Sequence, residues 1–199
     1  MDIAAHALWA GAGALLLQRR CGLAPRVVVA TVVLATLADV VHLLPVLAWV
    51  VLGEGTVHAL RDYVLATPGH EPPMPGGVLL VAHHLHCALH SAVVAGAVTL
   101  AGWLAARRVW FPLWGWWSHI LIDVPTHAAE YYAVPVLYPF SDRGFDGVAW
   151  NTTGFMVLNY ALLAAVWAGL LAKRLIRISP GAVQSVHARD MSRIERPLP

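Results

Sequence analysis

GWWSHILIDVPTH, residues 115–127, is an apolar stretch interrupted by two ionisable side chains, His119 and Asp123. Residues four apart lie on one face of a helix, so these two side chains would be stacked together. Pro125 should end or kink the helix just before His127. An imidazole and a carboxylate among apolar residues are costly unless they bind a metal, a proton or each other. The stretch therefore predicts a helix that carries a functional polar pair.

The composition is that of a membrane protein. Of the 199 residues, 59% are hydrophobic and 12% are charged, whereas soluble globular proteins average about 25% charged residues. The two cysteines, Cys21 and Cys87, are too few for a disulfide framework and are expected to be small buried hydrophobic residues. The formal net charge of +2 is small, and nucleic acid is not expected as a partner.

Five apolar stretches follow one another along the chain: 3–18, 27–52, 78–105, 109–125 and 153–172. The second, third and fifth are long enough for a bilayer, which needs ~20 helical residues. The first and fourth are short and would cross it only with support from the bundle or local thinning of the bilayer. We therefore predict an all-α, polytopic integral membrane protein with about five transmembrane or partly spanning helices. Residues 1–178 would form one membrane domain, and the polar segment 179–199 a flexible cytoplasmic tail.

Basic residues predict the orientation of these helices. They lie between the first two stretches, between the third and fourth, and after the fifth: Arg19, Arg20 and Arg26; Arg107 and Arg108; Lys173, Arg174 and Arg177. If all five stretches cross, these positions share one side, which the positive-inside rule makes cytoplasmic. The N-terminus would then be outside and the C-terminus cytoplasmic. The loop 53–77, on the outer side, is expected to be an ordered or partly helical lid.

Ionisable residues occur in or beside four of the apolar stretches: His6, Asp39, His42, His83, His84, His86, His90, His119, Asp123 and His127. In the predicted orientation they fall in the outer half or near the middle of the membrane. A single His/Asp cluster in the outer half of the bundle is the simplest arrangement. Imidazole and carboxylate ligands suit zinc, manganese, iron or nickel, and the lack of a thiolate pair argues against a structural zinc site. The alternatives are a structural hydrogen bond for His6 and a His119–Asp123 pair that only orients helices.

Several pieces of the chain resemble a known family: MDIAAHALW, ADVVHLLP, HCALHS, and GWWSHILIDVPTH followed by VLYPFSD and GVAW. Together they are similar to the membrane-bound metal-dependent hydrolases of bacteria and archaea, the group that includes the LexA-regulated inner-membrane proteins. That family is distantly similar to zinc-dependent phospholipases C. The resemblance implies an inner-membrane location. It also implies a set of metal ligands: His6, Asp39, His90, His119, Asp123 and His127, with His86 as an additional one. Glu130 would be a further ligand or a base.

These observations predict a membrane-embedded hydrolase that uses metal-bound hydroxide and a divalent metal, zinc first, with Asp123 and Glu130 as catalytic candidates. Its substrate would be a phosphoester, such as a phospholipid or a lipid-linked phosphate, so membrane lipid is the expected partner. Arg143, in an outer loop, would steer an anionic head group or be a plain solvated arginine. One alternative is a divalent-metal or proton transporter, which needs polar groups in both halves of the membrane. Another is a bis-histidine haem protein, with His42 or His90 facing His119. The oligomeric state stays open.

Overall fold

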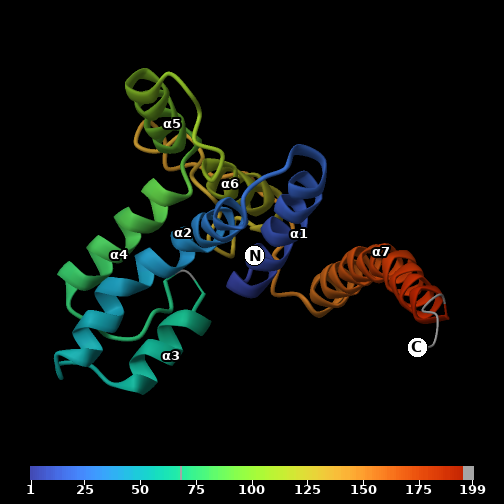
Figure 1. Ribbon diagram of the computed structural model, residues 1–199. Coiled ribbons are helices and arrows are strands. Elements are labelled where there is room, and N and C mark those ends of the chain that lie inside the picture. Colours follow the sequence, from blue (N-terminus) through green and yellow to red (C-terminus); the bar gives the residue numbers. More distant parts are fainter. Residues whose placement is uncertain (68, 195–199) are drawn as a thin grey trace. The chain divides into compact units, whose positions relative to one another are not determined.

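The computed structural model of the chain describes residues 1–67 and 69–194, and side chains as far as Lys173. Seven helices account for its regular structure (Figure 1), and these described residues contain no strand. The helices are α1 (Ile3–Cys21), α2 (Pro25–Val51), α3 (Val57–Leu65), α4 (Gly76–Leu89), α5 (Ala92–Ala106), α6 (Leu113–Thr126) and α7 (Thr153–Ile194). Met1–Asn159 form one compact unit, and a second begins at Tyr160 within α7. The predicted all-α class is confirmed.

Within the described part of the chain, two helices are long and apolar enough to cross a membrane: α2, and α7 over Thr153–Lys173. The pair α4 and α5 adds a third if it is counted as one bent span. About five spans are therefore not confirmed. Helix α6 has 14 residues, or about 21 Å at ~1.5 Å per residue, against a hydrocarbon core of ~30 Å. These apolar helices are compatible with a membrane location, whereas the orientation of the termini stays a prediction.

The third apolar stretch, 78–105, is not one helix. It is broken between α4 and α5, whose axes are bent by 64°. At the break, Ser91 Oγ accepts hydrogen bonds from the backbone N–H groups of Val93 and Val94 and so caps α5. Ser91 Oγ also donates to the Tyr138 carbonyl at 2.6 Å, which ties the break to the loop after α6. A serine at this position therefore favours the start of a new helix.

The loop predicted at 53–77 contains α3, which begins after the capping residue Thr56. This agrees with the expectation of a partly helical segment. Helix α6 ends at Thr126, one residue beyond Pro125, as expected from that proline. The sequence predicted a flexible tail over 179–199. Residues 179–194 of this segment continue α7, and their side chains are not described. Residues 195–199 lie outside the described chain.

Small residues let α2 and α6 approach closely. A Cβ atom on Gly115 would lie 1.9 Å from the Thr31 carbonyl oxygen, so only glycine fits at this point of α6. One turn further along each helix, Ala35 is fully buried and faces His119. Small residues at helix crossings in apolar surroundings allow backbones to approach in this way. The crossing brings Asp39 and Asp123, a further turn along, to the same level.

Candidate metal centre

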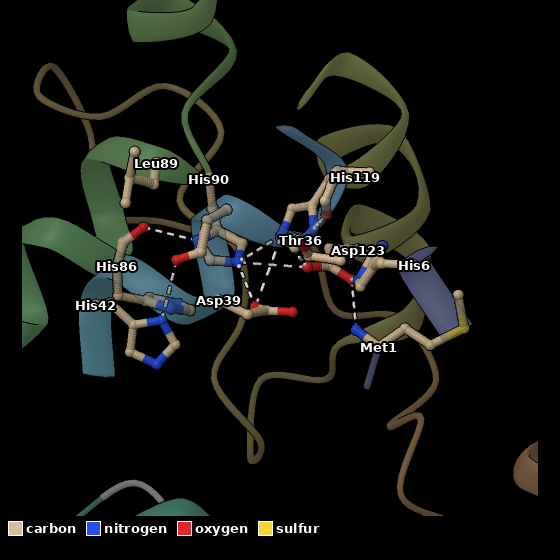
Figure 2. A network of polar contacts seen from close by, with 12 residues as sticks. Met1, His6, Thr36, Asp39, His42, His86, Leu89, His90, His119 and Asp123 are labelled. Atoms are coloured by element: carbon tan, nitrogen blue, oxygen red, sulfur yellow. Dashed lines mark hydrogen bonds and ion pairs between the residues drawn. The ribbon is translucent and has the colours of Figure 1, made fainter. Parts of the chain in front are cut away.

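Four side chains from three parts of the chain converge beside the α2–α6 crossing (Figure 2). Asp39 comes from α2, His90 from the break after α4, and His119 and Asp123 from α6. One ligand atom from each residue lies within 4.8 Å of the other three. His90, His119 and Asp123 are fully buried. Asp39 keeps 15% of its side chain exposed, so it is the member of the group that reaches the surface.

The separations between donor atoms match those of a metal ligand set. Tetrahedral ligands at ~2.0 Å from a zinc ion lie about 3.3 Å apart. His119 Nε2 lies 3.0 Å from His90 Nε2 and 3.0 Å from Asp123 Oδ2. His90 Nε2 lies 3.4 Å from Asp123 Oδ2 and 3.4 Å from Asp39 Oδ1, and His119 Nε2 lies 3.7 Å from Asp39 Oδ1. These five values bracket the ideal one, and the two carboxylate oxygens lie within 4.8 Å of each other.

Backbone carbonyls set the tautomers of both histidines. His119 Nδ1–H donates to the Ala35 carbonyl at 2.8 Å, and His90 Nδ1–H donates to the His86 carbonyl at 2.8 Å. A carbonyl oxygen can only accept, so the proton of each neutral ring sits on Nδ1 and leaves a lone pair on Nε2. Metal-ligating histidines are held by second hydrogen bonds of this kind. Both Nε2 atoms are therefore prepared as ligands.

Four lone-pair atoms that face one another in a buried site repel unless something positive lies among them. A proton on one Nε2 could be shared with only one or two of the other three atoms, whereas a divalent cation could be bound by all four atoms. Asp123 Oδ2 and Asp39 Oδ2 are buried and lack a hydrogen bond from any described residue. Two carboxylates and two neutral imidazoles balance a divalent ion in charge, and they suit zinc or manganese. The four residues therefore fit a metal ion.

The other oxygen of Asp123 faces a different set of groups. His6 Nε2 lies 2.8 Å from Asp123 Oδ1, and the His6 ring stacks on His119 with centroids 3.9 Å apart. The terminal ammonium of Met1 also contacts Asp123 Oδ1. His127 Nδ1 donates to the Asp123 carbonyl at 3.0 Å and is 3.8 Å from Asp123 Oδ1. His6 and His127, both predicted as ligands, therefore hold Asp123 from outside the group of four.

Other residues predicted for the site lie further away. The His86 carbonyl accepts the hydrogen bond from His90 Nδ1–H. The His86 and His90 rings pack together with centroids 4.2 Å apart. His86 Nε2 is buried and has no hydrogen-bond partner among the described residues. Glu130 and Arg143 are exposed, and neither lines the cavity described below. The described contacts give no support for a catalytic role of these two residues. Of the seven predicted metal ligands, the structure brings Asp39, His90, His119 and Asp123 into one group.

A cavity of about 410 Å³ opens beside Asp39. Its lining combines ionisable, aromatic and aliphatic side chains, among them Asp39, His42, His86, His127, Tyr131, Trp150, Leu43 and Leu79. His42 Nδ1 donates to the Ala38 carbonyl at 3.2 Å, which leaves Nε2 as an acceptor. The cavity therefore offers both hydrogen-bonding and apolar surface next to the candidate metal ligands.

One hydrogen bond joins the two sides of this cavity. Tyr132, in the loop after α6, donates to Glu71 Oε1 at 2.9 Å. Burial and the neighbouring carboxylate of Glu71 raise the pKa of the Tyr132 phenol, so it stays a donor at neutral pH. Partial burial acts to raise the pKa of Glu71, but hydrogen bonds, including that from Tyr132, outweigh it and lower the pKa. The pair thus links the segment before α4 to the loop that follows α6.

Comparison with known proteins adds no assignment, since no family model, curated protein or solved structure matches the chain.

The sequence did not indicate every contributor. The carbonyls of Ala35 and His86 fix the ligand tautomers, and backbone atoms leave no signal in a residue pattern. The Tyr132–Glu71 hydrogen bond joins residues 61 positions apart and was not predicted either. A signal did exist for Ala35: it lies four residues before Asp39, on the same face of α2.

Proposed function

We propose that the protein is a membrane-embedded, metal-dependent hydrolase of phosphoesters. The observation that carries the proposal is the group of four converging donors beside a cavity: Asp39, His90, His119 and Asp123. The resemblance of residues 115–127 and the other quoted pieces to membrane-bound metal-dependent hydrolases supports the same chemistry. We take zinc as the first candidate ion and membrane lipid as the source of substrate.

Each of the four residues has a defined task in this proposal. Asp39 and Asp123 supply two negative charges, and His90 and His119 two neutral nitrogens, so that the loaded site carries no net charge. A divalent ion held there lowers the pKa of a bound water and stabilises negative charge on phosphoryl oxygens. The partial exposure of Asp39 places the accessible side of the site at the cavity. His6 keeps the Asp123 carboxylate oriented, and His127 holds the backbone carbonyl of the same residue.

The cavity suits an amphiphilic substrate. Apolar side chains on its walls, including Ile3, Leu43 and Leu79, would contact hydrocarbon, and His42 and His127 would contact a polar head group. The described lining contains no lysine or arginine. The charge of a phosphoester would therefore be met at the metal centre and by imidazoles. A substrate with an apolar part next to a phosphate, such as a phospholipid or lipid-linked phosphate, uses both kinds of surface.

Hydrolysis by purified protein tests the proposal. The detergent-solubilised chain is stripped with chelator, reloaded with Zn²⁺ or Mn²⁺, and assayed with bis(p-nitrophenyl) phosphate and with fluorescent phospholipids. We expect metal-dependent turnover in the wild type and its loss in His119→Ala. His84→Ala is the matched control, because His84 is an exposed histidine whose ring contacts Tyr138 and not the metal group. Equal turnover in both variants would contradict a catalytic role of the four-residue group, and a loaded wild type without turnover would contradict a hydrolase.

A transporter for a divalent cation is the second candidate, and the broken α4–α5 pair favours it. Non-helical backbone at membrane depth occurs where it lines a site or cavity, and many transporters bind ions at such breaks. His90 lies at this break. Uptake of Zn²⁺ into vesicles that contain the protein would distinguish the two functions. A transporter would show uptake that His119→Ala abolishes, together with no phosphoester hydrolysis.

The geometry lends no support to a haem held between His90 and His119. Axial nitrogens on opposite faces of an iron lie about 4 Å apart, at ~2.0 Å per metal–nitrogen bond, with the macrocycle between them. His90 Nε2 and His119 Nε2 are 3.0 Å apart, and carboxylate oxygens of Asp39 and Asp123 lie within 3.7 Å of them. A porphyrin would have to displace both carboxylates.

A further inference from the structure

Helix α3 has two different faces and no buried residue. Val57 and Val64, seven residues apart and so on one face, are 73% and 51% exposed. Of the polar residues of the helix, His58 and Asp62 lie away from this face, whereas Arg61, four residues after Val57, flanks it. Among the helices α3 contacts α2 (Figure 1). A short amphipathic helix with an uncovered apolar face is typical of a segment that lies in a membrane interface.

The turn before α3 places the helix at the end of a span. Helix α2, one of the two span candidates, ends at Val51. The Trp49 ring then packs so closely on Gly55 that a Cβ atom on that glycine would lie 2.7 Å from it. Gly55 N–H also donates to the Trp49 carbonyl at 3.2 Å. Tryptophan is enriched at membrane–water interfaces, so α3 begins at the level where α2 leaves the hydrocarbon.

We propose that α3 is an interfacial helix that lies in the headgroup region, with Val57 and Val64 toward the acyl chains and Asp62 toward water. The occupant of its apolar face is membrane lipid. Continuity with α2 argues for lipid, because a helix that starts so soon after the end of a span has bilayer beside it. No partner protein is required to cover this face.

The position of α3 also defines how the cavity opens. Tyr63 and Val64 of α3 line it, together with Leu79 on α4. With Val64 at the acyl-chain level, the mouth of the cavity lies in the headgroup region. An amphiphile would then enter from the membrane and not from bulk water. This consequence, unlike the placement of α3, rests on the proposed function.

Spin labelling tests the placement without any assay of activity. In the full chain with Cys21→Ser and Cys87→Ala, single labelled cysteines replace Val57, Val64, Asp62 and, as a reference inside a span, Val29. The protein is reconstituted into phosphatidylcholine vesicles that contain phosphatidylglycerol. Collision rates of each label are measured with oxygen, which concentrates in hydrocarbon, and with a water-soluble nickel chelate.

We expect the oxygen-to-nickel ratio at positions 57 and 64 to be several-fold higher than at position 62 and to approach that at position 29. Equal ratios on the two faces of α3 would overturn the proposal. Labels at 57 and 64 that are shielded from both reagents would overturn it too, since protein would then cover the face. Positions 57 and 64 are independent readouts, so failure of one variant to fold leaves the other decisive. An interfacial α3 in a protein without hydrolysis would refute the proposed function alone.

Discussion

Asp123→Asn separates a metal centre from a set of structural hydrogen bonds. The asparagine keeps the shape of the side chain but removes one of the two carboxylate charges in the group. Asp123 Oδ2 lies 3.0 Å from His119 Nε2 and 3.4 Å from His90 Nε2, so it belongs to the donor set itself. Loss of an outer partner already lowers metal affinity by ~10–100-fold. We therefore expect a loss of at least about 100-fold.

The expected effect on stability follows from that loss. A metal present at 100 times its dissociation constant stabilises the folded protein by about 2.7 kcal/mol. If the affinity falls about 100-fold, the same metal concentration equals the dissociation constant and contributes about 0.4 kcal/mol. For a chain of 199 residues, the metal-dependent rise in Tm should drop from about 5–10 °C to about 1 °C.

The assay is thermal unfolding in detergent, with and without added Zn²⁺ or Mn²⁺, together with elemental analysis of bound metal. The readout is the increment that metal adds, and not the absolute Tm, because the substitution also changes the contact with His6. Asp62→Asn makes the same chemical change on an exposed residue of α3 and should keep the full increment.

Two outcomes would refute the reasoning. If metal adds the same increment to wild type and Asp123→Asn, this residue is not a ligand. If no divalent metal stabilises the wild type, and the substitution costs about 3–5 kcal/mol regardless of metal, the group is a buried ion pair that holds the helices.

Three further substitutions test the surroundings of the site. Gly115→Ala places a methyl group against the Thr31 carbonyl. It should lower the free energy of unfolding by about 1–3 kcal/mol and lower the metal content, as measured by thermal unfolding and elemental analysis. Unchanged stability and metal content would contradict the close α2–α6 crossing. Tyr132→Phe removes the hydrogen bond to Glu71. It should lower the free energy of unfolding by about 1 kcal/mol or less and leave the metal content unchanged. Loss of metal in this variant would show that the loop contributes to the metal centre. Arg143→Ala should leave metal content and hydrolysis unchanged, and a several-fold rise in KM for phospholipid would restore a steering role.

The sequence was most informative where chemistry and helix period coincided. His119 and Asp123 are four apart in an apolar stretch, and the structure places both in the buried group. Asp39 and His90 were identifiable for the same reason, because ionisable residues are rare in apolar segments. Their mutual distances could not be predicted, since these depend on the α2–α6 crossing and on the position of the break after His90.

The break itself shows why hydropathy has limits. The segment 78–105 is apolar apart from its histidines, Ser91 and Thr99, so a count of apolar residues predicts one span. What ends α4 is a set of tertiary hydrogen bonds. Trp116 Nε1 donates to the Leu89 carbonyl at 2.6 Å, and the Ala92 N–H donates to the Val136 carbonyl at 2.9 Å. These partners satisfy backbone groups that helix continuation would have satisfied.

These features together explain how a buried polar group can exist in so apolar a chain. Non-helical backbone at His90 is favourable only where other groups satisfy it, and α6 and the loop that follows supply them. The same α6 contacts α2 through Gly115, which places His119 Nδ1 against the Ala35 carbonyl. Helix α6, which satisfies backbone groups at the break, thus also sets the tautomer of His119. Metal binding should therefore depend on the packing of α2 against α6. A substitution that separates these helices would disrupt the arrangement of the ligands although it changes no ligand.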